Sequence, residues 1–159
     1  MQNKKPKNTY TRSEAKLKAA SYCAYQERSQ EEVRSKLYDL GLYSDDVEDL
    51  ISELITENFI NEERFAKAYV GGKFRIKKWG RRKIALGLKQ HNLSRYCVQK
   101  GMEEIDTEEY FEVLTKHILK KMDASTETDL FKKRNKIANF AIAKGFESEL
   151  VWEVIKDHF

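Results

Sequence analysis

The sequence predicts an all-α protein, an extended and curved tandem array of three three-helix repeats with about nine helices. Two observations carry this prediction. The 159-residue chain has a single proline, Pro6, so no proline interrupts a helix beyond the N-terminus. Three stretches that begin at Val33, Ile84 and Ile137 also align without a gap, and such internal similarity is the signature of a repeat protein.

Apolar residues recur at the same positions in all three aligned stretches, with the spacing of two successive helices. The three sets are Val33, Leu37, Leu42, Val47 and Ile51; Ile84, Leu88, Leu93, Val98 and Met102; and Ile137, Ala141, Phe146, Val151 and Ile155. We therefore expect each stretch to form a pair of helices that buries one apolar face.

A residue that tolerates a left-handed backbone separates the two helices of each pair: Gly41, Asn92 and Gly145. Such a residue is typical of the position that ends a helix in a Schellman motif. A serine that suits the N-cap of the next helix follows in every copy: Ser44, Ser94 and Ser148. These turn residues support the division of each stretch into two helices.

A further helix is expected before each pair, over residues 12–27, 62–77 and 108–122. Asn61 is the predicted N-cap of the second of these helices, and Ser29 with Glu32 forms a capping box for the helix that follows the first. Each unit of the array therefore has three helices.

The predicted domains are repeat 1 over residues 12–57, repeat 2 over residues 58–105 and repeat 3 over residues 106–159, after a basic flexible tail over residues 1–11. The insertion at residues 123–129 is expected to be a flexible loop. Gly71 and Gly72 fall inside a predicted helix, where they lower helix stability. They mark either a bend in that helix or its end.

Charge is strongly segregated along the chain, although the formal net charge is only +4. Residues 64–102 contain twelve basic residues and no acidic one, whereas residues 27–63 contain twelve acidic residues and three basic ones. We expect the basic segment to bind a partner or DNA. The candidate contact residues are Lys73, Arg75, Lys77, Lys78, Trp79, Arg81, Arg82, Lys83, Lys89 and Arg95.

Two interpretations of the basic segment stay open. Cations interleaved with aromatic rings suit a polyanionic partner, because the charges attract its backbone and the rings offer stacking surfaces. The same cations also fit a solvated helix face that pairs with the acidic segments on either side. The stretch from Lys73 to Lys83 is expected at the junction of the first and second units.

Residues 57–66, ENFINEERFA, followed by residues 80–84, GRRKI, and Leu88, resemble the signature of the RecX family of recombination regulators. That family is built of tandem three-helix repeats. The matching signature positions are Phe59, Ile60, Arg64, Phe65, Gly80 and Ile84. Asn58 and Asn61 stand where the family more often has Gly and Asp, and both keep the chemistry of a turn and a helix cap.

The resemblance implies binding to the RecA recombinase filament on single-stranded DNA. It implies that the chain modulates, with inhibition expected, the recombinase, ATPase and coprotease activities of RecA in DNA repair and the SOS response. The partners that the resemblance implies are the RecA filament and single-stranded or double-stranded DNA.

A helical nucleic-acid-binding module that acts independently of a recombinase is the alternative, because paired helices joined by short turns also occur in DNA-binding proteins. Charge argues against a groove-reading helix in the first unit. Phosphates would repel the carboxylates of its last helix, which are Asp45, Asp46, Glu48, Asp49, Glu53 and Glu57. Only the second unit, with Arg95 and Lys100, suits phosphate.

The residue pattern predicts neither an enzyme nor a metal or cofactor site. His91, His117 and His158 are scattered and lack a carboxylate or cysteine at metal-ligand spacing. Gly71-Gly72 lacks the Lys-Ser/Thr of a phosphate-binding loop, and Cys97 is expected in the core. No apolar run reaches membrane-spanning length, and two cysteines without a CxxC pattern fit a reducing compartment. We expect a cytoplasmic monomer without membrane contact.

The sequence also predicts the burial or the pairing of several individual residues. The apolar signature residues Phe59, Phe65 and Ile84 are expected to be buried where the first two units join. Arg64 is expected to pair with an acidic neighbour such as Glu57. Trp79 fits a core residue and an exposed anchor equally well.

Overall fold

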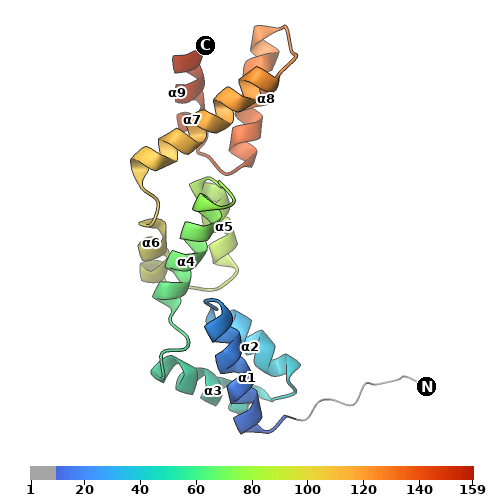
Figure 1. Ribbon diagram of the computed structural model, residues 1–159, viewed down its shortest axis with the longest axis vertical. Helices are drawn as coiled ribbons and strands as arrows, with labels where there is room; N and C mark the ends of the chain where they lie inside the picture. Colours follow the sequence, from blue (N-terminus) through green and yellow to red (C-terminus); the bar gives the residue numbers. More distant parts are fainter. Residues whose placement is uncertain (1–9) are drawn as a thin grey trace, which may run out of the picture.

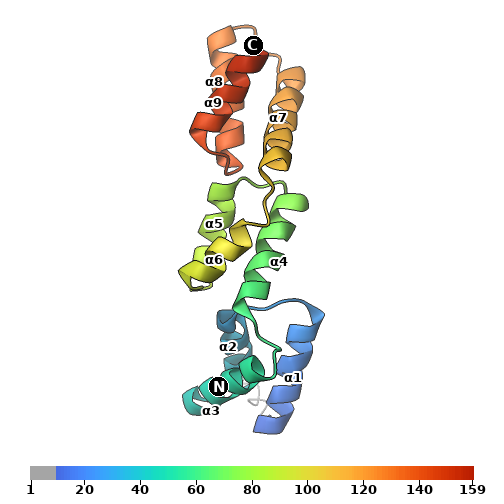
Figure 2. The same ribbon diagram turned by 90° about the vertical axis from the view of Figure 1, so that its left-hand side faces the viewer.

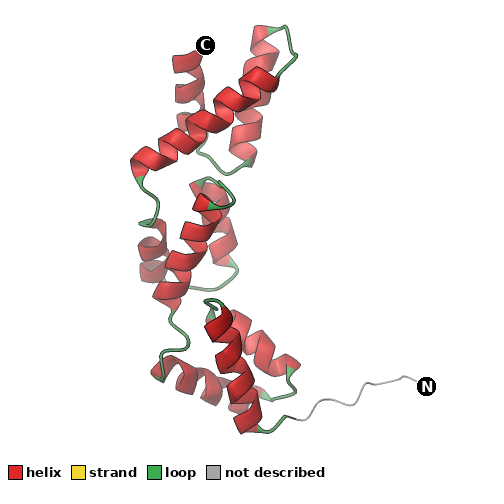
Figure 3. Cartoon of the chain, viewed as in Figure 1, coloured by secondary structure: helices red, strands yellow, loops and turns green. Residues whose placement is uncertain are grey.

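The computed structural model describes residues 10–159 and contains nine helices and no strand within them (Figure 3). The helices are α1 (Arg12–Tyr25), α2 (Gln30–Asp39), α3 (Ser44–Thr56), α4 (Glu62–Arg75), α5 (Arg81–Lys89), α6 (Arg95–Met102), α7 (Thr107–Ala124), α8 (Leu130–Ala143) and α9 (Ser148–His158). The tail expected over residues 1–11 lies almost entirely outside the described residues.

The helices form three groups stacked end to end in an extended, slightly curved column (Figures 1 and 2). Helices α1 to α3 form the first unit, α4 to α6 the second and α7 to α9 the third. The predicted all-α fold of three three-helix repeats is confirmed.

The apolar residues form two separate cores. One belongs to the first unit and contains buried residues such as Val33, Leu37 and Leu54, together with Ile60 from the following loop. The other runs without interruption through the second and third units and includes Phe74 and Tyr110. The second and third units are therefore joined by apolar packing, whereas the first unit has a core of its own.

The predicted helix stops are present. Gly41 has a φ of 90° and Gly145 a φ of 101°, which are backbone angles that glycine adopts without steric cost. The amide of Leu42 donates to the carbonyl of Leu37 at 3.3 Å, which is the long hydrogen bond of a Schellman motif. Asn92 has a φ of 51°, as expected from its alignment with the two glycines.

The predicted helix starts are only partly correct. Ser94 caps α6, Asn61 caps α4, and Ser29 with Glu32 forms the expected capping box of α2. Ser44 and Ser148 are instead the first residues inside α3 and α9. The capping prediction is wrong there because each helix begins one residue earlier than expected, with no side-chain hydrogen bond at its N-cap.

Helix α4 passes through Gly71 and Gly72 without ending and stops at Arg75. The chain then turns at Lys78, which has a φ of 58°. Its amide donates to the carbonyl of Phe74 at 3.1 Å, and the amide of Trp79 donates to the carbonyl of Lys73 at 3.1 Å. The turn directs the basic segment from the end of α4 into α5.

Candidate partner-binding surface

The basic segment is held against the third unit by its backbone. The amide of Gly80 donates to the carbonyl of Lys144 at 2.8 Å, and the amide of Arg82 donates to the carbonyl of Gly145 at 2.9 Å. The expected position at the junction of the first and second units is therefore wrong for the part of the segment around Gly80. The alignment of the repeats assigns the segment to the second unit, but it does not show whether the segment contacts the first unit or the third.

A buried tyrosine fixes the start of α5. The hydroxyl of Tyr110, a fully buried residue, donates to Glu147 Oε1 at 2.6 Å and accepts from the amide of Arg81 at 3.1 Å. The guanidinium of Arg81 lies over the Tyr110 ring and donates to Glu147 Oε2 at 3.1 Å. Burial, together with the hydrogen bond to Glu147, raises the pKa of the Tyr110 hydroxyl, so this group stays protonated and donates.

Intramolecular pairing accounts for only two of the cations between residues 73 and 83. Arg75 pairs with Glu104 at 3.4 Å and Arg81 with Glu147. The other five form no ion pair with any described residue; they are Lys73, Lys77, Lys78, Arg82 and Lys83. These five residues are called the unpaired cations below. Between residues 73 and 83, the self-paired interpretation therefore holds for Arg75 and Arg81 alone.

Trp79 combines the two roles that the sequence left open. It is half-buried and packs against the core shared by the second and third units. The ammonium groups of Lys73 and Lys83 lie over its ring, 4.9 Å and 4.4 Å from the centroid. The ring thus holds two cations on the surface through cation–π attraction.

Lys89 and Arg95 lie apart from the unpaired cations. Both are exposed, Lys89 at the end of α5 and Arg95 at the start of α6. Lys89 lies seven positions after Arg82 in α5, which corresponds to roughly 10 Å along the helix axis. The structure does not bring these two candidate residues into the group.

Most of the signature residues are structural. Ile60, Phe65 and Ile84 are buried, with 1%, 4% and 0% of their surface exposed. The expected burial of Phe59 is wrong, since its ring keeps 36% of its surface exposed.

Arg64 also differs from its expectation. It pairs with Glu27 of the first unit and donates to the carbonyl of Asn58 at 3.0 Å. The expected partner Glu57 is bound instead by Lys16, at 2.8 Å. Arg64 therefore holds the linker at Asn58 against the first unit.

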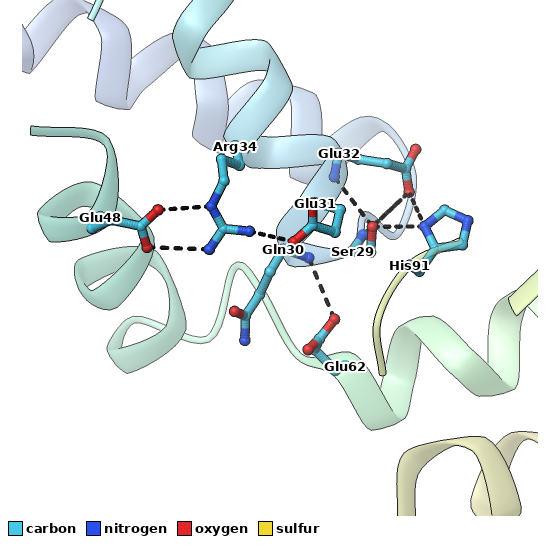
Figure 4. Close-up of polar contacts among 8 residues, drawn as sticks. All are labelled: Ser29, Gln30, Glu31, Glu32, Arg34, Glu48, Glu62 and His91. Atoms are coloured by element: carbon cyan, nitrogen blue, oxygen red, sulfur yellow. Dashed lines mark hydrogen bonds and ion pairs between the residues drawn. The ribbon is translucent and has the colours of Figure 1, made fainter. Parts of the chain in front are cut away.

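The first and second units meet through polar groups (Figure 4). The Ser29 hydroxyl lies 2.8 Å from His91 Nδ1, and the amide of Gln30 donates to Glu62 Oε2 at 3.4 Å. Burial of the Glu62 carboxyl raises its pKa. None of these contacts was predicted, because Ser29 and His91 come from different repeats and share no motif.

A groove with a volume of about 490 Å³ lies beside this junction. One wall is the exposed face of α4 at Tyr69, Gly72 and Ile76; Glu27 and His91 line it from the first unit and from the residues after α5. Sequence periodicity identifies the buried face of α4 but gives no signal for this groove.

The remaining reactive residues are not gathered into a site. His117 is half-buried and its Nε2 lies 3.1 Å from the carbonyl of Lys78; burial lowers its pKa. Cys97 is half-buried, so its expected core position is wrong. Within residues 10–159, no group of His, Cys, Asp or Glu could hold a metal ion.

No helix in this part of the chain is long and apolar enough to cross a membrane.

Three stacked three-helix units, with a basic segment in the second unit that is hydrogen-bonded to the third, define the class, an all-helical tandem-repeat protein. The chain belongs to the RecX family. Models of the family's first, second and third three-helix domains match residues 15–54, 61–102 and 108–155.

Curated relatives carry the name Regulatory protein RecX. The protein from Clostridium acetobutylicum is 28% identical over 149 residues, which cover 91% of this chain and 69% of the relative. The protein from Lactobacillus johnsonii is 33% identical over 94 residues, 59% of this chain and 35% of the relative. That from Clostridium botulinum strain Eklund 17B is 28% identical, with 82% and 61% covered. The chain thus spans between about a third and about two thirds of these relatives.

Solved structures share the fold. The crystal structure of RecX from Lactobacillus salivarius has a TM-score of 0.82 and 23% identity, and the match covers 92% of this chain and 95% of that one. A second crystal structure, of a regulatory protein RecX, has a TM-score of 0.78 and 23% identity, with 92% and 73% covered.

Proposed function

We propose that the chain binds the RecA recombinase filament on single-stranded DNA and modulates its recombinase, ATPase and coprotease activities, with inhibition as the direction. It acts in DNA repair and the SOS response, in the cytoplasm, as a monomer without cofactor or catalytic turnover of its own. Membership of the RecX family, whose relatives are named regulatory proteins, supports this proposal.

The observation that carries the proposal is the group of five unpaired cations at the end of α4 and the start of α5. Like charges this close together repel one another, and an acidic or polyanionic partner relieves that repulsion. Hydrogen bonds from Gly80 and Arg82 to the third unit hold the group in place. A fixed group of cations binds a partner with less loss of conformational entropy than a mobile tail does.

The charges elsewhere on the array suit a protein filament on DNA better than naked DNA. Helix α3 presents Asp45, Asp46 and Asp49 as exposed carboxylates in its first two turns. Phosphates repel such a face, whereas a partner that is itself a protein can offer cations to it. Acidic and basic units in one column therefore favour a partner with charges of both signs.

Co-sedimentation with RecA filaments assembled on single-stranded DNA tests the proposal. The decisive variant replaces Lys77, Lys78 and Arg82 by Glu and leaves Arg81 unchanged, because Arg81 pairs with Glu147 inside the structure. We expect binding to weaken more than tenfold at about 0.1 M salt, since a favourable attraction becomes a repulsion.

The matched control replaces Lys116, Lys132 and Lys156 by Glu, which changes the net charge equally at exposed positions of the third unit. We expect this control to bind within about threefold of the parent. An equal loss of filament binding in both triple variants would show that net charge alone explains the effect. Unchanged binding of the variant at Lys77, Lys78 and Arg82 would show that the contact surface lies elsewhere. A parent that does not bind the filament would contradict the proposed function.

The second candidate, an independent nucleic-acid-binding module, is favoured by the cations around Trp79. The same experiment with bare single-stranded DNA separates the two functions. Equal retention on bare DNA and on the filament would support the nucleic-acid module, whereas retention on the filament alone supports regulation of RecA.

A further inference from the structure

The groove along α4 contains a glycine that the packing of the described residues does not require. Gly72 lies inside α4, where glycine lowers helix stability relative to alanine because its unfolded backbone is freer. A Cβ atom at this position would have no atom within 4 Å. At the neighbouring Gly71, a Cβ atom would meet the end of the flexible Arg75 side chain at 2.5 Å. The space above Gly72 is open to an approaching molecule.

Apolar side chains lie next to this open space. Ile76, one turn after Gly72, keeps 79% of its surface exposed, and Phe65 lies buried at the other end of the groove. The half-buried ring of Tyr69 lines the groove between them. A bare backbone flanked by an exposed isoleucine and a tyrosine is suited to contact with another apolar surface.

The two ends of the groove differ in charge, because the carboxylates at one end are paired with Arg64 and Arg28 and the lysines at the other end form no ion pair with a described residue. Glu27 and Glu32 line it near the start of α4, and Lys73 and Lys77 line it near the end. From residue 65 to the end of α4 at Arg75 the helix axis rises roughly 15 Å, or about three turns. Nucleic acid fits this arrangement poorly, because a phosphate backbone that follows the groove beyond Lys73 and Lys77 meets arginines that are already paired with Glu27 and Glu32.

We propose that this groove docks an α-helix of the partner protein, with its acidic residues toward Lys73 and Lys77 and a small or apolar residue over Gly72. A helix of about three turns matches the length of the groove, and a missing side chain at Gly72 lets the two helix axes approach closely. The proposal rests on the proposed function, in that the partner protein is the RecA filament. Beyond the proposed function, it specifies where on this chain the partner binds and which kind of partner segment occupies the groove.

Filling the groove tests the proposal. Gly72→Leu places a side chain in the open space, and Ile76→Ser removes the exposed apolar surface beside it. Both are read by co-sedimentation with RecA filaments on single-stranded DNA, with urea unfolding as the control for folding. We expect Gly72→Leu to weaken filament binding at least tenfold and Ile76→Ser at least threefold, while both variants unfold at or near the urea concentration of the parent.

The matched control is Ala143→Leu, which adds the same kind of side chain at an exposed helical position of the third unit. It is expected to bind like the parent. If the parent binds the filament and each single variant, Gly72→Leu and Ile76→Ser, binds it with an affinity within twofold of the parent's, the groove proposal is overturned and the proposed function stands. If the parent does not bind, the proposed function fails first. An equal loss on bare single-stranded DNA would overturn the protein helix as occupant.

Discussion

Gly80 lies in backbone contact with Gly145 across the junction of the second and third units. A Cβ atom on Gly80 would stand 2.2 Å from the carbonyl carbon of Gly145, and a Cβ atom on Gly145 would stand 2.7 Å from the backbone nitrogen of Lys83. Neither contact is sterically possible without movement of the backbone. The two glycines allow the hydrogen bonds that fix the basic segment to the third unit.

This contact predicts opposite effects for the same substitution at two glycines. Gly80→Ala should destabilise the protein by about 1–3 kcal/mol or more, because backbone atoms must move to admit the methyl group. Gly72→Ala should stabilise it by up to about 1 kcal/mol, because its methyl group meets no atom within 4 Å and alanine favours the helix. Urea unfolding followed by circular dichroism measures both. Equal midpoints for the two variants would contradict the steric interpretation.

The helix stop in the first unit gives a second prediction. Gly41→Ala should cost about 1 kcal/mol of unfolding free energy, since alanine is strained at a φ of 90°. Asn92→Gly, at the equivalent position in the second unit, should change stability by less than about 0.5 kcal/mol, because both residues tolerate positive φ. The urea midpoints of the two variants check this pair. A Gly41→Ala variant as stable as the parent would argue against the left-handed turn.

These stops could be predicted from the sequence because chirality restricts which residues adopt a positive φ. Three aligned Gly or Asn residues are therefore a reliable signal. Lys78 adopts a φ of 58° without any such signal, since lysine rarely adopts a positive φ. The errors at Ser44 and Ser148 amount to one residue of helix register, which local sequence does not fix.

Contacts between repeats could not be predicted in the same way. Periodicity identified the buried faces of the helices, including Ile84 and Leu88. The partners Ser29 and His91, or Arg64 and Glu27, belong to different repeats, and their pairing depends on how the units dock. The basic segment was identified from its charge alone, but its contact with the third unit depends on the closeness of Gly80 and Gly145.

Tyr110 supports a third prediction, on the polar contacts at the start of α5. Tyr110→Phe keeps the ring and removes the hydroxyl, which leaves Glu147 Oε1 and the amide of Arg81 without this partner. We expect a loss of about 1–3 kcal/mol in unfolding free energy. The control is Tyr96→Phe. Tyr96 is exposed, and its hydroxyl donates to Glu63 at 3.3 Å. We expect this variant to lose less than about 0.5 kcal/mol of unfolding free energy. Similar losses in both variants would refute a special role for the buried hydroxyl.

The last prediction concerns pH and His117. Burial lowers the pKa of His117; the hydrogen bond to the Lys78 carbonyl opposes this shift, and the nearby cations Lys144, Lys120 and Lys78 add to it, so the net direction is downward. The unfolded chain therefore binds this proton more readily than the folded protein does. The stability contribution is fully present above the ordinary pKa near 6.5 and is lost as the pH falls below that value.

Urea unfolding at pH 7.5 and pH 5.5 measures this effect of His117. We expect the parent to lose more stability between these two pH values than the His117→Gln variant, because glutamine does not titrate. His158→Gln, at the exposed end of α9, serves as the control for replacing a histidine by glutamine away from the buried site. An identical pH dependence in the parent and in His117→Gln would show that protonation of His117 does not oppose folding. Carboxylates that titrate over the same range contribute equally to all three proteins, so the difference between variants isolates the imidazole.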